Sequence, residues 1–216
     1  MHLRVWSGVA IATIVALGTV MSETTTIARW SFDGREAGAN SVQGAPSGRL
    51  EGAKAVDGRE GKALSFQDWS VVDYLKPDPS KATRLVVQHD DRLNPAPPFA
   101  LRAWINVSSK PIYYGGIIEK GQGFGSSYRL LLLRDMRIEG SLGARHATVR
   151  SPSPVELNKW IDVSLVVEDS ALVLLLDGVE VAREALAPGT KPEATAPILI
   201  GERFSGMIDE VTIEKR

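Results

Sequence analysis

Four aromatic residues stand in stretches of the sequence that read as loops, where a ring can face a ligand. They are Trp69, Tyr113, Tyr114 and Phe124. A sugar ring can stack its apolar face on such a ring while nearby polar groups hydrogen-bond its hydroxyls. Aromatic rings in loops can equally cover the edges of a sheet. These residues therefore allow two interpretations, carbohydrate binding and a purely structural role.

The sequence lacks the common motifs of nucleophilic, metal-dependent and phosphate chemistry. It contains no Gly-x-Ser-x-Gly elbow. His89 precedes Asp90 and Asp91, a combination typical of a solvated turn, and His146 is too distant for zinc-ligand spacing. The spaced glycines in 121–125 have no helix after them, so they indicate a hairpin turn rather than a phosphate loop. We therefore expect no catalytic residues among these motifs.

Short β-strands are the elements that must position these residues, and the clearest lie in one hairpin. The stretch 160–167 alternates between apolar and other residues, which is the period of a half-buried strand. The apolar run 171–176 predicts a second strand. Asp177-Gly178 suits a tight two-residue turn into a third strand at 179–185.

Similar patterns predict strands along the rest of the chain. They fall at 27–32, 62–66, 70–74, 84–87, 99–107, 115–120, 128–134, 136–139, 144–149, 198–201 and 206–213. The glycine-rich stretch 35–61 is predicted to be a long loop with at most one short strand near 49–53. No stretch of length shows a helical period with caps. We therefore predict a single all-β domain, an antiparallel two-sheet sandwich or jelly roll, with Trp30, Trp104 and Trp160 in its core.

Composition excludes one class of partner and points to a compartment. The 216 residues carry a formal net charge of -1 with interspersed signs, so there is no electrostatic case for nucleic acid. The chain has no cysteine. An exported domain without disulfides must depend on its core or on a bound ion. The absence of cysteine favours a bacterial over an animal extracellular protein.

The amino terminus has the pattern of a secretory signal. His2 and Arg4 precede an uncharged, mostly apolar run over 5–21, and the chain turns polar from Ser22. We predict a signal peptide over residues 1–22, whose cleavage leaves no membrane span and places the protein in the periplasm, the cell envelope or the medium. The alternative is an uncleaved anchor, although the run is shorter than the ~20 apolar residues of a spanning helix. Amino-terminal sequencing of exported protein distinguishes the two.

Seven fragments of the chain follow one another in the order of a known family. One is Gly61-Lys62-Ala63-Leu64-Ser65-Phe66, and the others are 29–34, 99–105, 116–121, 160–178, 199–201 and 204–211. In this order they resemble laminin G-like domains of the concanavalin A-like lectin/glucanase superfamily, in which the step G-x-A-L-x-F is similar to 61–66. The resemblance implies a jelly-roll domain over 27–216 in which the first and last strands are neighbours. Asp162 and Leu175 depart from the histidine and tyrosine that are usual in the family.

The resemblance also suggests a calcium ion. If the first and last strands pair, Asp33 and Asp209 could meet at one sheet end, with carbonyls of the following loop as further oxygen ligands. Alternatively, Asp33 starts the turn with Gly34, while Asp209 accepts hydrogen bonds from a loop or pairs with an arginine. Structural Ca²⁺ is therefore one of two interpretations of this pair.

Glucanases of the superfamily raise the question of catalysis. Retaining enzymes need two carboxylates about 5–5.5 Å apart, which a strand with Glu-x-Asp-x-x-Glu supplies. No such run occurs, and neither Asp209-Glu210 nor the stretch 135–139 has the spacing.

We therefore predict an exported, non-catalytic module that binds an extracellular or cell-envelope carbohydrate or glycoprotein. The alternative is a protein-interaction or structural module of the cell envelope without sugar specificity, and a glucanase-type hydrolase comes third.

Overall fold

The computed structural model describes residues 24–68, 79–121, 127–143 and 147–216, which form β-strands and two short 3-10 turns. No helix in these ranges is long and apolar enough to cross a membrane. The 3-10 turns are η1 (Pro79–Lys81) and η2 (Asp91–Leu93). The strands are β1 (Thr25–Trp30), β2 (Gly48–Glu51), β3 (Lys54–Asp57), β4 (Lys62–Phe66), β5 (Arg84–Val87), β6 (Phe99–Val107), β7 (Tyr114–Lys120), β8 (Tyr128–Leu133), β9 (Ile138–Leu142), β10 (Ala147–Arg150), β11 (Trp160–Val167), β12 (Ala171–Leu176), β13 (Val179–Ala185), β14 (Ile198–Ile200) and β15 (Gly206–Lys215).

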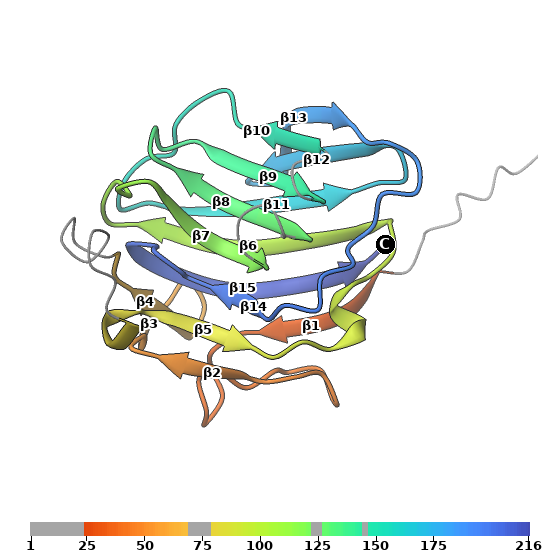
Figure 1. Cartoon of the computed structure of the whole chain (residues 1–216). Helices are drawn as coiled ribbons and strands as arrows, with labels where there is room; N and C mark the ends of the chain where they lie inside the picture. The colour runs from red at the N-terminus through yellow and green to blue at the C-terminus, as the bar shows by residue number, and fades with distance from the viewer. Residues whose placement is uncertain (1–23, 69–78, 122–126, 144–146) are drawn as a thin grey trace, which may run out of the picture.

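The strands form two antiparallel sheets that pack face to face. Sheet A has the order β13-β12-β11-β6-β15-β4-β3, and sheet B has the order β10-β9-β8-β7-β14-β5-β2. Sheet B lies toward the viewer in Figure 1. The first half of β15 pairs with β4, and its second half pairs with β1. The predicted sandwich is therefore confirmed, and so is the pairing of the first and last strands.

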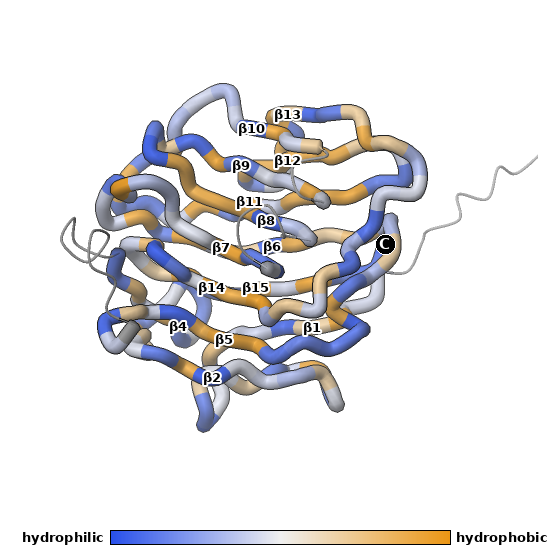
Figure 2. Tube along the Cα trace, viewed as in Figure 1, coloured by the Kyte–Doolittle hydropathy of each residue, from blue (hydrophilic) through white to orange (hydrophobic). Residues whose placement is uncertain are grey.

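Alternate residues of the central strands point between the sheets and build the core. Leu101, Ala103 and Ile105 of β6 are fully buried, as are Val163 and Leu165 of β11. Figure 2 shows the hydrophobic stretches that run along these strands. Each buried aliphatic side chain contributes about 1.5–3 kcal/mol, which is the main source of stability for a chain without disulfides.

The core prediction is confirmed for Trp30, which is fully buried, but it is wrong for the other two tryptophans. Trp104 and Trp160 are only partly buried, because the alternation that turns their neighbours inward turns them outward. The guanidinium of Arg59 lies 4.9 Å from the Trp104 ring centroid. Beside it, Asp162 accepts hydrogen bonds of 2.7–2.9 Å from Nε and Nη2 of Arg102. The outer face of sheet A is therefore polar at this point.

The predicted hairpin is confirmed, including its turn. Asp177 and Gly178 have φ values of 50° and 76°, and β13 begins at the next residue. Glycine adopts this left-handed conformation without a steric penalty, and aspartate tolerates it.

Two predictions for polar stretches need correction. The stretch 35–61 is predicted to hold at most one short strand near 49–53; β2 lies there, but β3 is a second strand, because β5 and β4 supply their pairing partners. The strand predicted from Met136 begins at Ile138, since Met136 lies in a turn with a φ of 67°. The signal peptide and the strand predicted at 70–74 lie outside the described residues.

Candidate functional site

A row of cross-strand partners runs across the outer face of sheet B. Arg49 lies opposite Val86, Val86 opposite Leu199, Leu199 opposite Glu119, and Glu119 opposite Arg129. The residues before and after Val86, Leu199 and Arg129 belong to the core. Since successive strand residues point to opposite faces, this row lies on the outside of the sandwich.

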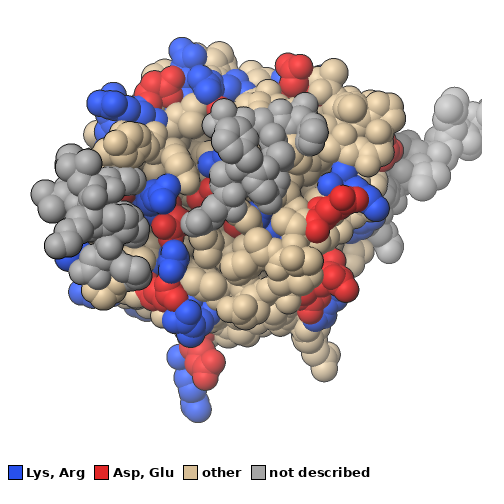
Figure 3. All heavy atoms as spheres, viewed as in Figure 1, with Lys and Arg blue, Asp and Glu red and all other residues tan. Residues whose placement is uncertain are grey.

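Eight side chains are linked across this face. We call them the ionic chain: Arg49, Glu51, Arg84, Glu202, Arg203, Tyr114, Arg129 and Glu119. In its first half, Glu51 pairs with Arg49 and accepts from Nε of Arg84 at 2.6 Å, and Nη1 of Arg84 donates to Glu202 at 2.9 Å. Figure 3 shows positive and negative side chains side by side on this side of the molecule.

Tyr114 connects the second half of the ionic chain. Nη1 of Arg203 donates to its hydroxyl at 2.8 Å, while Nε of Arg203 lies 3.8 Å from Glu202. The guanidinium carbons of Arg203 and Arg129 lie 5.2 Å and 5.3 Å from the tyrosine ring centroid, within cation–π range. Burial raises the pKa of Tyr114, which keeps its hydroxyl protonated.

Glu119 ends the ionic chain and is fully buried. Its Oε2 accepts from Nε of Arg129 at 3.1 Å, whereas its Oε1 has no hydrogen-bond partner among the described residues. The carboxylate fits because residue 116 is glycine: a Cβ there would lie 2.2 Å from Oε1. Burial raises the pKa of Glu119 to about 7, although Arg129 opposes the rise.

The structure describes two of the four aromatic residues predicted to bind a ligand. Tyr113 is 58% exposed and precedes β7, and Tyr114 lies within the ionic chain. Trp69 and Phe124 lie outside the described residues. The prediction that both tyrosines lie in a loop is wrong for Tyr114, which is the first residue of β7, a central strand of sheet B. One exposed ring and one arginine-flanked ring therefore lie at the start of this strand.

Sequence reasoning missed the charged members of the ionic chain. Arg129 interrupts an otherwise apolar strand, and Glu119 follows Ile117 and Ile118 at the end of another. A charge at such a position is the signal that could have indicated them. No comparable signal marks Arg84, Glu202 or Arg203. Arg84 contacts Glu51 and Glu202, and Arg203 contacts Tyr114, all of which are distant in sequence.

A groove of about 450 Å³ adjoins the first half of the ionic chain. Its apolar lining includes Val86, Leu199 and Pro197, and its charged lining comes from Arg49, Glu51 and Arg84. Apolar surface beside a few polar groups is a common arrangement in ligand sites. A sugar ring could pack on the apolar residues and hydrogen-bond to the charged ones.

Asp33 and Asp209 both contact the turn between β3 and β4, so the pairing of β1 with β15 brings them to one sheet end. Asp209 is fully buried and accepts from the backbone N–H groups of Arg59, Glu60 and Glu210 at 2.8–3.0 Å. Asp33 accepts from the N–H of Lys62 at 2.7 Å. Asp209 therefore accepts hydrogen bonds from a neighbouring loop, which is the alternative to a calcium ligand.

Calcium at this pair stays a prediction. Calcium takes six to eight oxygen ligands, and no group of three or more acidic or histidine side chains in the described ranges could hold a metal ion. The four N–H groups already occupy carboxylate oxygens, so the described residues do not fit the ion as they stand.

The calcium prediction has a direct test. It expects the melting temperature to rise when calcium is added, and expects Asp33→Asn to abolish that rise. Thermal unfolding with calcium and with a chelator measures both. A melting temperature that calcium leaves unchanged contradicts the prediction.

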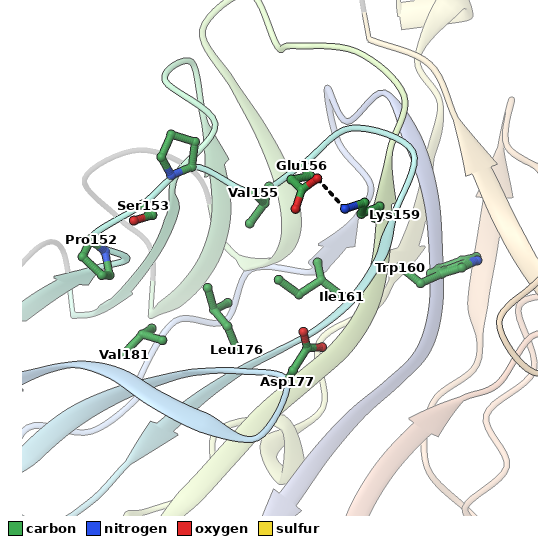
Figure 4. Close-up of a pocket in the computed structure, with 11 residues that line it drawn as sticks. Pro152, Ser153, Val155, Glu156, Lys159, Trp160, Ile161, Leu176, Asp177 and Val181 are labelled. Atoms are coloured by element: carbon green, nitrogen blue, oxygen red, sulfur yellow. Dashed lines mark ion pairs between the residues drawn. The ribbon is translucent and has the colours of Figure 1, made fainter.

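A second groove, of about 310 Å³, lies where the loop 151–159 passes the hairpin of β11, β12 and β13 (Figure 4). Val155, Ile161, Leu176 and Val181 line it, while the ring of Trp160 points away from them. Its charged groups are the Glu156–Lys159 pair at 2.5 Å and Asp177. This groove is mainly apolar, in contrast to the face of sheet B.

Comparison with a family model locates the chain among known folds. A model described as the Concanavalin A-like lectin/glucanases superfamily matches residues 80–216. No curated protein matches the chain.

Solved structures share the fold at low sequence identity. Domain 4 of AbnA, an extracellular arabinanase from Geobacillus stearothermophilus in complex with arabinotriose, has a TM-score of 0.69 and 15% identity, covering 90% of this chain and 94% of that one. The receptor-binding domain of botulinum neurotoxin mosaic serotype C/D has a TM-score of 0.64 and 16% identity, covering 87% and 46%. Trypanosoma rangeli sialidase, in complex with sialic acid, has a TM-score of 0.60 and 15% identity, covering 88% and 30%. The chain thus spans less than half of the toxin domain and of the sialidase, and these likenesses concern the fold alone.

Proposed function

This chain belongs to the concanavalin A-like lectin/glucanase superfamily, and from that premise we propose an exported, non-catalytic module that binds carbohydrate or glycoprotein on the outer face of sheet B. The observation that carries the proposal is the groove beside the ionic chain. There Leu199 and Val86 offer an apolar surface, while Arg84 and Glu51 offer a donor and an acceptor for hydroxyls. Neighbours that bind arabinotriose or act as receptor-binding domains support the same class of function.

The state of the carboxylates supports a binding role over hydrolysis. A glycosidase needs one carboxyl group at the leaving oxygen and a second at the sugar carbon or at a water molecule. Glu119 and Glu202 are 0% and 2% exposed, and each is held by an arginine, Arg129 and Arg84 respectively. Carboxylates that are buried in ion pairs are poorly placed to reach a glycosidic bond.

Export is the second part of the proposal. The predicted signal peptide over residues 1–22 supports it, as does the likeness to an extracellular arabinanase domain. The partner is then an extracellular or cell-envelope carbohydrate or glycoprotein.

One observation favours a protein partner as the second candidate. Leu157 and Val179 are 47% and 64% exposed, and each lies close in sequence to residues that line the apolar groove of Figure 4. Together with the apolar lining of the groove, these residues could form the kind of exposed apolar patch that marks protein contacts. A partner that docks there would leave the face of sheet B uninvolved.

Arg49→Ala separates the two candidates. Arg49 is largely exposed, so its truncation should leave the fold intact while removing a charged wall of the groove. We expect affinity for a bound glycan to fall about tenfold, the value of one hydrogen bond to a charged group. Glycan-array screening followed by titration calorimetry measures the loss.

Arg183→Ala is the matched control. Arg183 is an exposed, ion-paired arginine on β13 in sheet A, so its truncation should leave glycan affinity unchanged. If the folded protein binds no glycan on the array, the proposal of carbohydrate binding is wrong.

A further inference from the structure

A fully buried lysine lies beneath the groove of sheet B. Lys120 comes two residues after Ile118, a core residue, so its side chain points to the inner side of β7, while Glu119 between them faces outward. Lys120 pairs with no carboxylate in the described part of the chain. Burying an ammonium group without a counter-charge is costly, so its hydrogen bonds have to compensate for the lost water.

The ammonium group of Lys120 bonds to two segments that are distant in sequence. Nζ donates to the carbonyl oxygen of Ala196 at 3.0 Å and lies 3.1 Å from Nδ1 of His89. Burial lowers the pKa of Lys120 to about 8, so at pH 7 Nζ is still mostly charged and Nδ1 acts as the acceptor. On the other side of the imidazole, Oδ1 of Asp91 lies 3.2 Å from Nε2, which carries the proton in this tautomer.

These two bonds join segments that carry the groove. Ala196 lines the groove, and so does Gly121, the residue after Lys120. His89 follows β5, and Val86 of that strand lines the groove as well. Lys120 therefore holds three parts of the groove wall together from the core side of the sheet.

A proton on His89 would break this connection. Histidine is the side chain that ordinarily takes up a proton between pH 5 and pH 8. A proton on Nδ1 of His89 removes the acceptor and places a second cation 3.1 Å from the ammonium group of Lys120. Like charges at this distance repel each other, and the buried surroundings screen them less than water does.

Six other charged or titratable residues belong to the segments around this pair: Asp90, Asp91, Arg92, Tyr128, Lys191 and Glu193. Asp91 contacts the far nitrogen of His89, so it favours the protonated imidazole. Asp90 is bound to Arg92 at 2.8 Å. Tyr128, opposite Lys120 on β8, stays uncharged because burial raises its pKa well above the ordinary value. The last two residues pair with each other at 3.5 Å and are exposed.

We infer that His89 and Lys120 make ligand binding in the groove of sheet B sensitive to acid. The inference rests on the proposed function and adds the regulation of its site. Proton uptake by His89 breaks the bond to Lys120, and the repelled ammonium group no longer holds Ala196 against the segment after β5. The groove wall loosens, and a glycan that packs on Val86 and Pro197 loses affinity. His89 and Lys120 are positioning residues, because neither lines the groove.

The test compares affinity at two pH values in the unaltered full chain and in His89→Asn. Calorimetry with the tightest glycan from the array is done at pH 7.5 and at the lowest pH, down to pH 5, at which circular dichroism shows the same fold. We expect the affinity of the unaltered protein to fall about tenfold, because one hydrogen bond to a charged group is lost. Asparagine stays neutral, and its amide oxygen can replace Nδ1 as acceptor, so His89→Asn should bind equally at both pH values.

His146→Asn is the matched control. His146 is the other histidine after the predicted signal peptide, so its replacement should keep the tenfold fall. An affinity of the unaltered protein that does not change with pH overturns this inference and leaves the proposed function standing. A fall that persists in His89→Asn also overturns it and points to Glu119, whose pKa is about 7 on the same sheet.

Two further measurements decide the inference where affinity or the variant fails. If no glycan binds at either pH, the proposed function is wrong, and NMR of the backbone amides of Ala196 and Gly121 over the same pH range is decisive. Signals that shift in the unaltered protein but not in His89→Asn support the inference, and signals that stay fixed overturn it. If His89→Asn does not fold, NMR of the His89 ring has to show proton uptake at the pH at which affinity falls, and a mismatch overturns the inference.

Discussion

Asp209→Ala is expected to lower the free energy of unfolding by roughly 3 kcal/mol or more. The buried carboxylate accepts hydrogen bonds from the N–H groups of Arg59, Glu60 and Glu210. Truncation removes three hydrogen bonds to a charged acceptor, each of which contributes about 1.5–3 kcal/mol. Denaturant unfolding followed by tryptophan fluorescence measures the change.

The position of Asp209 explains why the loss should spread beyond one turn. Asp209 lies where β15 passes from its pairing with β4 to its pairing with β1, next to a register shift between Asp209 and Thr212. Its Oδ2 also lies against Gly58, where a Cβ would be 2.6 Å away. The carboxylate therefore joins the turn between β3 and β4 to the strand on which both β4 and β1 depend.

Asp57→Asn is the control for this prediction. Asp57 lies at the end of β3, beside the same turn, and pairs with Lys62 at 2.6 Å, but its side chain is 95% exposed. Exposed ion pairs contribute little to stability, so this substitution should leave the unfolding midpoint unchanged. Equal midpoints for Asp209→Ala and the unaltered protein would contradict the role assigned to Asp209.

Glu119→Gln is expected to stabilise the protein at pH 8 by up to roughly 3 kcal/mol. Burial raises the pKa of Glu119 to about 7 in the folded protein, against an ordinary value of 4.5 for a glutamate side chain. The folded chain therefore holds this proton more tightly than the unfolded chain, and the difference corresponds to roughly 3 kcal/mol. Glutamine has a similar shape and stays neutral at every pH.

The stabilising effect of Glu119→Gln should depend on pH. The contribution of protonated Glu119 to stability is fully present below pH 4.5 and is lost as the pH rises through about 7. The advantage of Glu119→Gln should therefore grow across this range and level off above it. The charged groups that act on Glu119 are Arg129, Glu202 and Arg203. Unfolding free energies measured from pH 4 to pH 8 test the expected trend.

Glu51→Gln is the contrasting variant on the same face. Burial opposes the change, but hydrogen bonds and charge from Arg84 and Arg49 lower the pKa of Glu51. Its ionised form therefore supports the fold, and Glu51→Gln should destabilise the protein at neutral pH. If Glu119→Gln and Glu51→Gln change the free energy of unfolding in the same direction at pH 8, the charge assignments along the ionic chain are wrong.

Local sequence pattern predicted much of the fold. The strands at 62–66, 84–87, 99–107 and 179–185 have the predicted bounds, since alternation and turn residues act within a few positions. The Asp177-Gly178 turn follows from backbone preferences of its own two residues. These strands and this turn can be predicted without knowing which distant strands they pair with.

Pairing between distant strands decided the rest. The strands β2 and β3 form because β5 and β4 offer edges, and β14 brings Leu199 between Val86 of β5 and Glu119 of β7. The residues of the ionic chain come from β2, β5, β7, β8 and the connection from β14 to β15. No spacing in the sequence relates them, because their proximity depends on sheet order and register.

The sequence by itself therefore determined an all-β sandwich with a family resemblance, and it placed Tyr113 correctly just before a strand. Tertiary structure alone decided that Tyr114 lies among arginines, that Glu119 is buried with a raised pKa, and that Asp209 holds a distant turn. The physical reason is that strand formation depends on local alternation, whereas burial and charge pairing depend on neighbours far along the chain.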